Sequence, residues 1–155
     1  SGPVSILTKM WRETPETMRN SVDLDRIMHL YVRAETQRLT NIRAGQNRRK
    51  GNPGPEMSIA KLAFAELNQD ILTAAVDMMG MAGQINYDYT FRRPEDLSVD
   101  GSESGVQHGF LRVRANSIEG GTSEIMRNIL GEQVLGLPGE PRIDKDVPWI
   151  EVPRS

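Results

Sequence analysis

Two glycines stand directly before a pair of hydroxyl residues and a carboxylate in the last third of the sequence, where residues 118–125 read IEGGTSEI. Thr122 or Ser123 is suited to cap a helix that begins here, and Glu124 suits its first turn. Exposed amides and hydroxyls at a helix start also favour a polar or anionic ligand. The residues alone leave two interpretations open, an ordinary capped helix and a ligand-binding turn.

A second glycine-bearing segment, residues 79–83, reads MGMAG and follows a long apolar pattern. Glycines often stop a helix, and they also let the backbone approach a ligand closely. The spacing Gly-x-x-Gly is shared with an RNA-binding loop, but the helical surroundings and the acidic balance of the chain oppose that function. A helix stop is the simpler interpretation of this segment taken by itself.

The sequence has two histidines, His29 and His108, and no cysteine. We expect each histidine to be a surface or packing residue, because no partner that would make it a switch or a ligand accompanies it. No Glu-x-x-His pair occurs, which removes the ligand set of a di-iron bundle. The lack of cysteine excludes disulfides, thiolate metal sites and a cysteine nucleophile. A Ser-His-Asp relay stays open, although no nucleophile-elbow pattern supports it.

The size and charge of the chain limit the kinds of protein to which it can belong. Its 155 residues are enough for one domain with a core, and its formal net charge of −2 gives no indication of a nucleic-acid surface. No apolar run approaches the roughly 20 residues that span a bilayer, and no secretory signal opens the sequence. We therefore expect a cytoplasmic location, and we leave residues 1–3 out of the fold prediction because they resemble a cloning remnant.

Four helices are predicted to position these residues, over 24–48, 56–79, 106–115 and 122–135, with a mostly loop segment over 84–104. Helix-capping residues precede the first helix, and basic residues followed by Gly and Pro end it. Apolar residues at helical spacing form one stripe on each long helix. The first stripe comprises Leu24, Ile27, Met28, Tyr31, Ala34, Leu39 and Ile42, and the second comprises Met57, Ala60, Phe64, Leu67, Ile71, Ala75 and Met78.

The ends of the chain have their own patterns. Residues 6–11 look like the last turns of a helix that begins upstream, and Thr14 is predicted to cap a new start with Pro15 in the first helical position. The Pro-rich, charged residues 140–155 predict an extended tail. The sequence therefore predicts an all-α fold, an antiparallel helical bundle over residues 1–139 followed by this tail.

One long motif is far more specific than these patterns. Residues 117–132 read SIEGGTSEIMRNILGE, and residues 134–138 read VLGLP. The motif closely resembles the C-terminal signature of acyl-CoA dehydrogenases, and the resemblance extends from about Ile6 to Pro138, with the helices and the glycine segment in matching order. It implies the C-terminal helical bundle of a three-domain flavoenzyme, without the N-terminal helical domain, the middle β-domain and the first part of the bundle.

Enzymes of this family remove a proton from the α-carbon of an acyl-CoA and pass a hydride from the β-carbon to FAD, which gives the 2,3-enoyl-CoA. An electron-transferring flavoprotein then reoxidises the flavin. The resemblance thus implies FAD as the cofactor, an acyl-CoA substrate, an electron-transferring flavoprotein as a partner, and a homo- or hetero-oligomer. We expect the 155 residues alone to be inactive.

Two cofactor sites follow from the resemblance. In the family, the loop after the second long helix reaches the FAD of a neighbouring subunit, which implies a role for Asp77, Gly80 and Gly83. Family members commonly have glutamine at the position of Asp77, and a carboxylate near the pyrophosphate would be repelled unless it were screened. Thr122 and Glu124 match family positions near FAD.

The catalytic base is the main departure from the family pattern. Many members carry a catalytic glutamate at the position of Gly120, and glycine cannot abstract a proton. Glu119 is one step away along the chain and is expected to point elsewhere, out of the reach that a general base needs. Two hypotheses follow. The chain belongs to a catalytic subunit whose base lies upstream of Ile6, or to a non-catalytic, structural or FAD-holding subunit of a hetero-oligomer.

Overall fold

The computed structural model describes residues 2–51, 54, 56–85, 105–139 and 147–152. Within these ranges the chain forms helices and contains no strand. The five α-helices are α1 (Val4–Glu13), α2 (Ser21–Arg49), α3 (Glu56–Met78), α4 (Gly105–Arg112) and α5 (Ser123–Ile129). Short 3-10 turns occur at Glu16–Met18 (η1), Gly80–Gln84 (η2), Val113–Ser117 (η3) and Trp149–Glu151 (η5), and one π-helical turn at Leu130–Val134 (η4).

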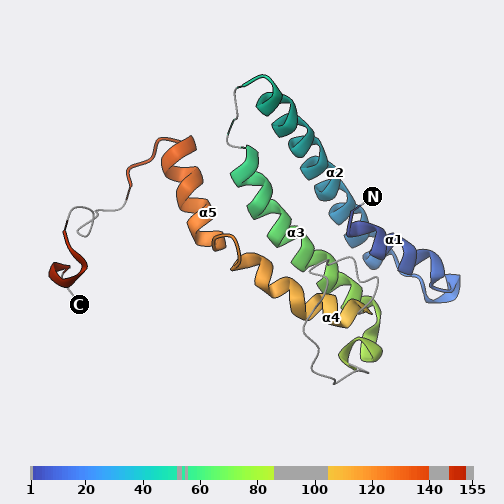
Figure 1. The fold of residues 1–155 in the computed structure, drawn as a ribbon. Helices are drawn as coiled ribbons and strands as arrows, with labels where there is room; N and C mark the ends of the chain where they lie inside the picture. The colour runs from blue at the N-terminus through green and yellow to red at the C-terminus, as the bar shows by residue number, and fades with distance from the viewer. Residues whose placement is uncertain (1, 52–53, 55, 86–104, 140–146, 153–155) are drawn as a thin grey trace.

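Helix α3 lies in the middle of the bundle (Figure 1). It packs against α2 and α1 on one side, and against α4, η3 and α5 on the other. Helix α2 runs antiparallel to α3, and the chain from α4 through η3 to α5 returns alongside α3. The all-α antiparallel bundle predicted from the sequence is therefore confirmed.

The long helices begin and end where their sequence signals lie. The side chain of Asn20 accepts a hydrogen bond from the backbone N–H of Asp23, at 2.8 Å, so α2 begins at Ser21, three residues before the predicted start. Helix α3 ends at Met78, within one residue of the prediction, and Gly80 follows with φ +58°. The third predicted helix ends early, because α4 tightens into η3 at Val113.

The predicted restart at Thr14 is wrong. Thr14 ends α1 instead, since both its backbone N–H and its hydroxyl donate to the carbonyl oxygen of Met10, at 2.9 and 2.8 Å. Pro15 is extended, with ψ 142°, and precedes only the single 3-10 turn η1. The predicted loop over 84–104 lies outside the described residues, except for Gln84 and Ile85.

The core is built where α1, α2 and α3 meet. Helix α1 contributes Leu7, α2 contributes Ile27 and Leu30, and α3 contributes Leu67 and Ile71, all buried. Leu72 of α3 and Val113 of η3 are also fully buried. Burial of such side chains supplies most of the favourable free energy of folding.

The apolar stripe of α2 is only partly buried, which differs from the simplest expectation for such a stripe. Ile27 lies in the core, but five members of the stripe are at least 40% exposed. They are Leu24, Met28, Tyr31, Leu39 and Ile42, and we call them the outer stripe. Helical spacing shows that these residues share a side of the helix, but it does not show what covers that side.

Two ion pairs join α2 to α3 and record their register. Arg26 Nη1 lies 2.7 Å from Asp77 Oδ2, and Arg33 Nη1 lies 2.6 Å from Asp70 Oδ2. A step of seven residues forward on α2 is matched by a step of seven backward on α3, as an antiparallel pair requires. Exposed pairs of this kind contribute little to stability, so the core carries the free energy and the pairs report the alignment.

The burial pattern predicts a large difference between two leucine truncations. Leu72→Ala removes a side chain that is 0% exposed, and Leu111→Ala removes one that is 61% exposed. We expect Leu72→Ala to lower the free energy of unfolding by about 2–5 kcal/mol, because it leaves a cavity, and Leu111→Ala to change it by about 0.5 kcal/mol or less. Urea denaturation followed by circular dichroism measures both, and equal losses would contradict the placement of α3 at the centre.

Candidate functional site

The glycine-rich segment forms a turn between η3 and α5. Gly120 and Gly121 both have positive φ, +66° and +101°, a region that L-residues with a side chain rarely adopt. Thr122 follows in extended conformation and caps α5, because its hydroxyl oxygen accepts a hydrogen bond from the backbone N–H of Ile125, at 3.2 Å. The hydroxyl hydrogen of Thr122 can still be donated to a ligand. The capping role predicted for this position is therefore confirmed for Thr122.

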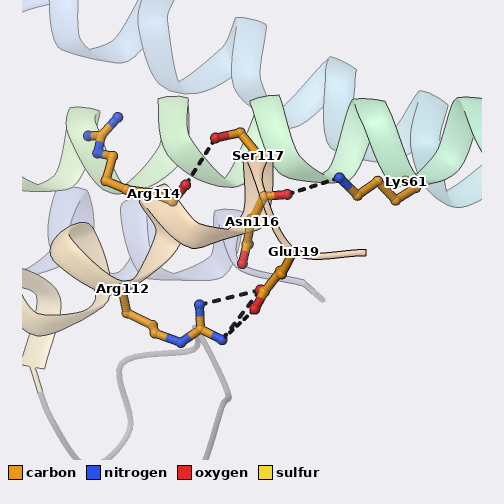
Figure 2. A network of polar contacts seen from close by, with 6 residues as sticks. All are labelled: Lys61, Arg112, Arg114, Asn116, Ser117 and Glu119. Atoms are coloured by element: carbon orange, nitrogen blue, oxygen red, sulfur yellow. Dashed lines mark hydrogen bonds and ion pairs between the residues drawn. The ribbon is translucent and has the colours of Figure 1, made fainter. Parts of the chain in front are cut away.

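A lysine from α3 contacts both ends of this turn, and Figure 2 shows its contact at the first end, with Asn116. The ammonium group of Lys61 donates to the backbone carbonyl oxygen of Asn116, at 3.2 Å, and also to that of Gly121. Sequence reasoning missed this residue, because main-chain acceptors leave no trace in a sequence. The one available signal is that Lys61 is the sole basic residue in the sequence of α3.

The side chain of Glu119 is paired with an arginine. Both carboxylate oxygens of Glu119 accept hydrogen bonds from the guanidinium of Arg112, at 3.1–3.3 Å, as Figure 2 shows. The Arg112 side chain is 17% exposed and that of Glu119 is 52% exposed. A carboxylate in a bidentate pair with arginine is fixed in direction. This geometry supports the expectation that Glu119 does not serve as the base.

Asn116, at the start of the turn, is 6% exposed, and its side-chain nitrogen has no partner within the described ranges. A buried donor without an acceptor costs free energy, so such groups are nearly always satisfied in native proteins. We therefore expect a group from outside the described residues to accept this hydrogen bond. Glu124, the other predicted residue of this site, is 78% exposed at its side chain and lies 3.7 Å from Arg127.

The second predicted site lies at the other end of α3. Asp77 is paired with Arg26, so a cation screens the carboxylate that replaces the family's usual glutamine. Gly80 has open space around it, with nothing within 4 Å of a Cβ built there. Lys61 and Asp77 are separated by 16 residues, or about 24 Å along a helix. One copy of the chain therefore does not bring Gly80 and Thr122 together.

Gly83 has a packing role in addition to the cofactor role that its motif suggested. A Cβ built at Gly83 would lie 2.5 Å from the carbonyl oxygen of Val76 and 3.0 Å from its side chain. The residue is buried, so its lack of a side chain lets η2 fold back on the end of α3. Close packing within the chain therefore favours glycine at this position.

The remaining candidates are placed away from these turns. His29 is exposed and lies 3.7 Å from Asp25, and His108 is partly buried in α4. In the part of the chain that the structure describes, no group of three His, Cys, Asp or Glu residues is arranged to hold a metal ion. The described helices include none that is long and apolar enough to cross a membrane.

A cavity of about 570 Å³ opens between α1, α2 and α3. Its α3 residues are Phe64, Leu67, Asn68 and Ile71, which differ from those that contact the turn and η3. Tyr31 of the outer stripe also lines it. The cavity therefore belongs to the side of α3 that faces α1 and α2, and not to the glycine turn.

Gly83 and Gly45 have opposite surroundings and give a matched prediction. Gly83→Ala forces a methyl group against a backbone carbonyl, whereas Gly45→Ala, in the exposed part of α2, meets nothing within 4 Å. We expect Gly83→Ala to lower the free energy of unfolding by about 1–3 kcal/mol and Gly45→Ala to raise it by about 0.5–1 kcal/mol. Thermal denaturation of both variants checks this, and a neutral Gly83→Ala would show that η2 does not pack as described.

Comparisons with known proteins agree on one family. The family model for the acyl-CoA dehydrogenase C-terminal domain matches residues 18–135. Acyl-CoA dehydrogenase IpdE1 of Mycolicibacterium smegmatis is 36% identical over 89 residues, which cover 57% of this chain and 19% of that protein. Acyl-CoA dehydrogenase IpdE1 of Mycobacterium tuberculosis is 33% identical over 90 residues, which cover 58% of this chain and 20% of that protein. The matched region is thus about a fifth of the length of these relatives.

A solved structure shares the fold. The structure titled Tcur3481-Tcur3483 steroid ACAD superimposes with a TM-score of 0.68 at 19% sequence identity, over 88% of this chain and 34% of that chain. At this identity the likeness concerns the fold alone. The family model covers more than half of the chain, from η1 to the end of η4. The chain therefore belongs to the acyl-CoA dehydrogenase family and carries its C-terminal domain.

Proposed function

We propose that this chain is the C-terminal domain of an FAD-dependent acyl-CoA dehydrogenase, which oxidises an acyl-CoA thioester to the 2,3-enoyl-CoA. The observation that carries the proposal is the glycine turn of the family motif, which ends in the Thr122 cap with the hydroxyl hydrogen free to donate. Family membership supports the same activity. An electron-transferring flavoprotein is the proposed acceptor of the electrons.

The residues present fit FAD as the cofactor. Thr122 offers a hydroxyl donor, Gly80 leaves its backbone open to close approach, and Arg26 neutralises the charge of Asp77. FAD, when bound, supplies the acceptor for the hydride that leaves the β-carbon of the substrate. The part of this chain is to bind and orient, through Thr122, Glu124 and the segment from Asp77 to Gly83.

The base that takes the α-proton is proposed to lie outside this sequence. Gly120 has no side chain, and Glu119 is engaged by Arg112 through both carboxylate oxygens. To act as a base, Glu119 would have to leave a charge-assisted pair that is stronger than a neutral hydrogen bond. The same observation supports the second candidate function, a non-catalytic or FAD-holding subunit of a hetero-oligomer, in which a partner subunit supplies the base.

Flavin reduction tests this function. In the complete protein, mixed anaerobically with an acyl-CoA in a stopped-flow instrument, we expect the visible absorbance of FAD to bleach, and Glu119→Gln to leave the rate within a few-fold of the wild type. A general base contributes about 10²–10⁴-fold, so a loss of that size with FAD still bound would identify Glu119 as the base.

The matched control for this measurement is Glu13→Gln, which removes an exposed carboxylate at the end of α1, remote from the turn in sequence. Bleaching that appears only when a second subunit is added would favour the FAD-holding function. No bleaching under any condition would refute the dehydrogenase proposal.

The outer stripe supports the proposed oligomer. Leu24, Met28, Tyr31, Leu39 and Ile42 present adjoining apolar surface on α2, and grouped exposure of this kind marks interaction sites more often than scattered apolar residues do. The solved structure that shares the fold carries two designations in its name, Tcur3481 and Tcur3483. We propose that α2 takes part in contacts between subunits.

The oligomer prediction is tested by placing a charge in the stripe. We expect Leu39→Glu to weaken self-association, because the charge would have to be desolvated at the interface, whereas Thr36→Glu, at an exposed position of α2 outside the stripe, should leave it unchanged. Multi-angle light scattering over a range of concentrations gives the mass. A wild-type mass equal to one chain at every concentration would count against the proposal.

A further inference from the structure

Lys61 is partly buried and donates to the main chain of a distant segment. Its ammonium group contacts two main-chain carbonyl oxygens, those of Asn116 and Gly121, and the two acceptors lie at opposite ends of the turn. The segment between them, residues 117–120, is closed into a loop by this one side chain. Figure 2 shows Lys61 reaching from α3 to the start of the turn.

The turn benefits from a contact with α3 because its two glycines allow its backbone many conformations. Gly120 and Gly121 occupy positive φ, and glycine has more backbone freedom to lose on ordering than any other residue. Two other side-chain contacts of the turn are local in sequence. The Ser117 hydroxyl donates to the carbonyl oxygen of Arg114, and Arg112 pairs with Glu119. Lys61 instead connects the turn to α3, across 55 and 60 residues of sequence.

Lys61 also contacts the backbone directly before the first candidate site residue, Thr122. Gly121 directly precedes Thr122, so the carbonyl held by Lys61 belongs to the peptide unit that places the Thr122 cap. A Cβ at Gly120 would lie 3.9 Å from Lys61 Cε, so the lysine stem runs beside the first glycine as well. Hydrogen bonds from a charged donor are roughly twice as strong as neutral ones, which suits a single side chain that fixes two acceptors.

We propose that Lys61 is a positioning residue for the cofactor, which acts by holding the turn so that Thr122 and Glu124 are presented in one fixed arrangement. This inference rests on the proposed function, because it assigns the purpose of that arrangement to FAD binding. Lys61 itself is not placed in contact with FAD or substrate. Its effect passes through the carbonyl groups of Asn116 and Gly121.

The experiment removes the ammonium group and keeps the length of the side chain. Lys61→Met is compared, in the complete protein, with the wild type, with Lys61→Arg, which restores a charged donor, and with Arg33→Met. Arg33→Met is the matched control, since it removes a cation that also contacts α3 but from α2. Amide hydrogen exchange over residues 117–126 reports on the turn, flavin fluorescence gives the dissociation constant of FAD, and stopped-flow mixing gives the rate of flavin reduction.

We expect Lys61→Met to speed exchange in residues 117–126 by tenfold or more and to weaken FAD binding about tenfold, the size expected for losing a charge-assisted hydrogen bond. With FAD at saturation, the reduction rate should return to within threefold of the wild type, because positioning affects binding and not the chemistry. Lys61→Arg should recover most of both losses, and Arg33→Met should leave both within twofold. A general loss of stability would not be confined to this segment and would not be rescued by arginine.

Unchanged exchange in Lys61→Met, or faster exchange with FAD affinity within twofold of the wild type, would overturn the inference. If Lys61→Met does not fold, Lys61→Gln, which keeps one donor, takes its place with the same expected directions. A wild-type protein that binds no FAD refutes the proposed function and the cofactor role of Lys61 together. Hydrogen exchange reports on the turn with or without FAD. It therefore distinguishes a protein that binds no FAD from one in which Lys61 does not order the turn.

Discussion

Helix α3 has to be covered on two sides at once, and the arrangement of the other helices follows from that requirement. On one side, Leu67 and Ile71 pack into the core shared with α1 and α2. On the other, Gln69 and Thr73 receive the guanidinium of Arg114, and Lys61 holds the turn that follows η3. A position on this second side is therefore fixed relative to a rigid, buried helix. The buried core thus fixes the position of the turn through α3, although the turn itself is only partly buried.

The length of α3 also separates the two cofactor segments of the chain. The glycine turn lies toward the beginning of α3, and Asp77 and Gly80 lie at its end. In the proposed enzyme, each segment contacts a different FAD, and a second subunit completes each site. The outer stripe of α2 gives a physical reason for such an assembly, since it is apolar surface that α1 and α3 do not cover. In that enzyme, assembly and cofactor binding would both depend on the neighbouring subunit.

Sequence patterns predicted the helices well because caps, glycines and apolar spacing act locally. Asn20 and Thr122 cap helices through contacts three residues away, and both were predictable. Features that depend on distant parts of the chain were not. The spacing of the α2 stripe could not show that most of it is left exposed, and the motif at Gly83 could not show the close contact with Val76. Lys61 was invisible because its acceptors are carbonyl groups, which every residue has.

The ion pairs between α2 and α3 have a consequence for how the two helices find their alignment during folding. If α2 slid by seven residues, a displacement of about 10 Å, Arg33 would meet Asp77 and one pair would persist. Arg26 would then face Gln84, and Asp70 would face Thr40, so the second pair would be lost. The doubled pair thus makes the slipped alignment distinguishable from the native one. The two weak ion pairs together favour the native register of α2 and α3, which one pair alone would not distinguish from this slipped register.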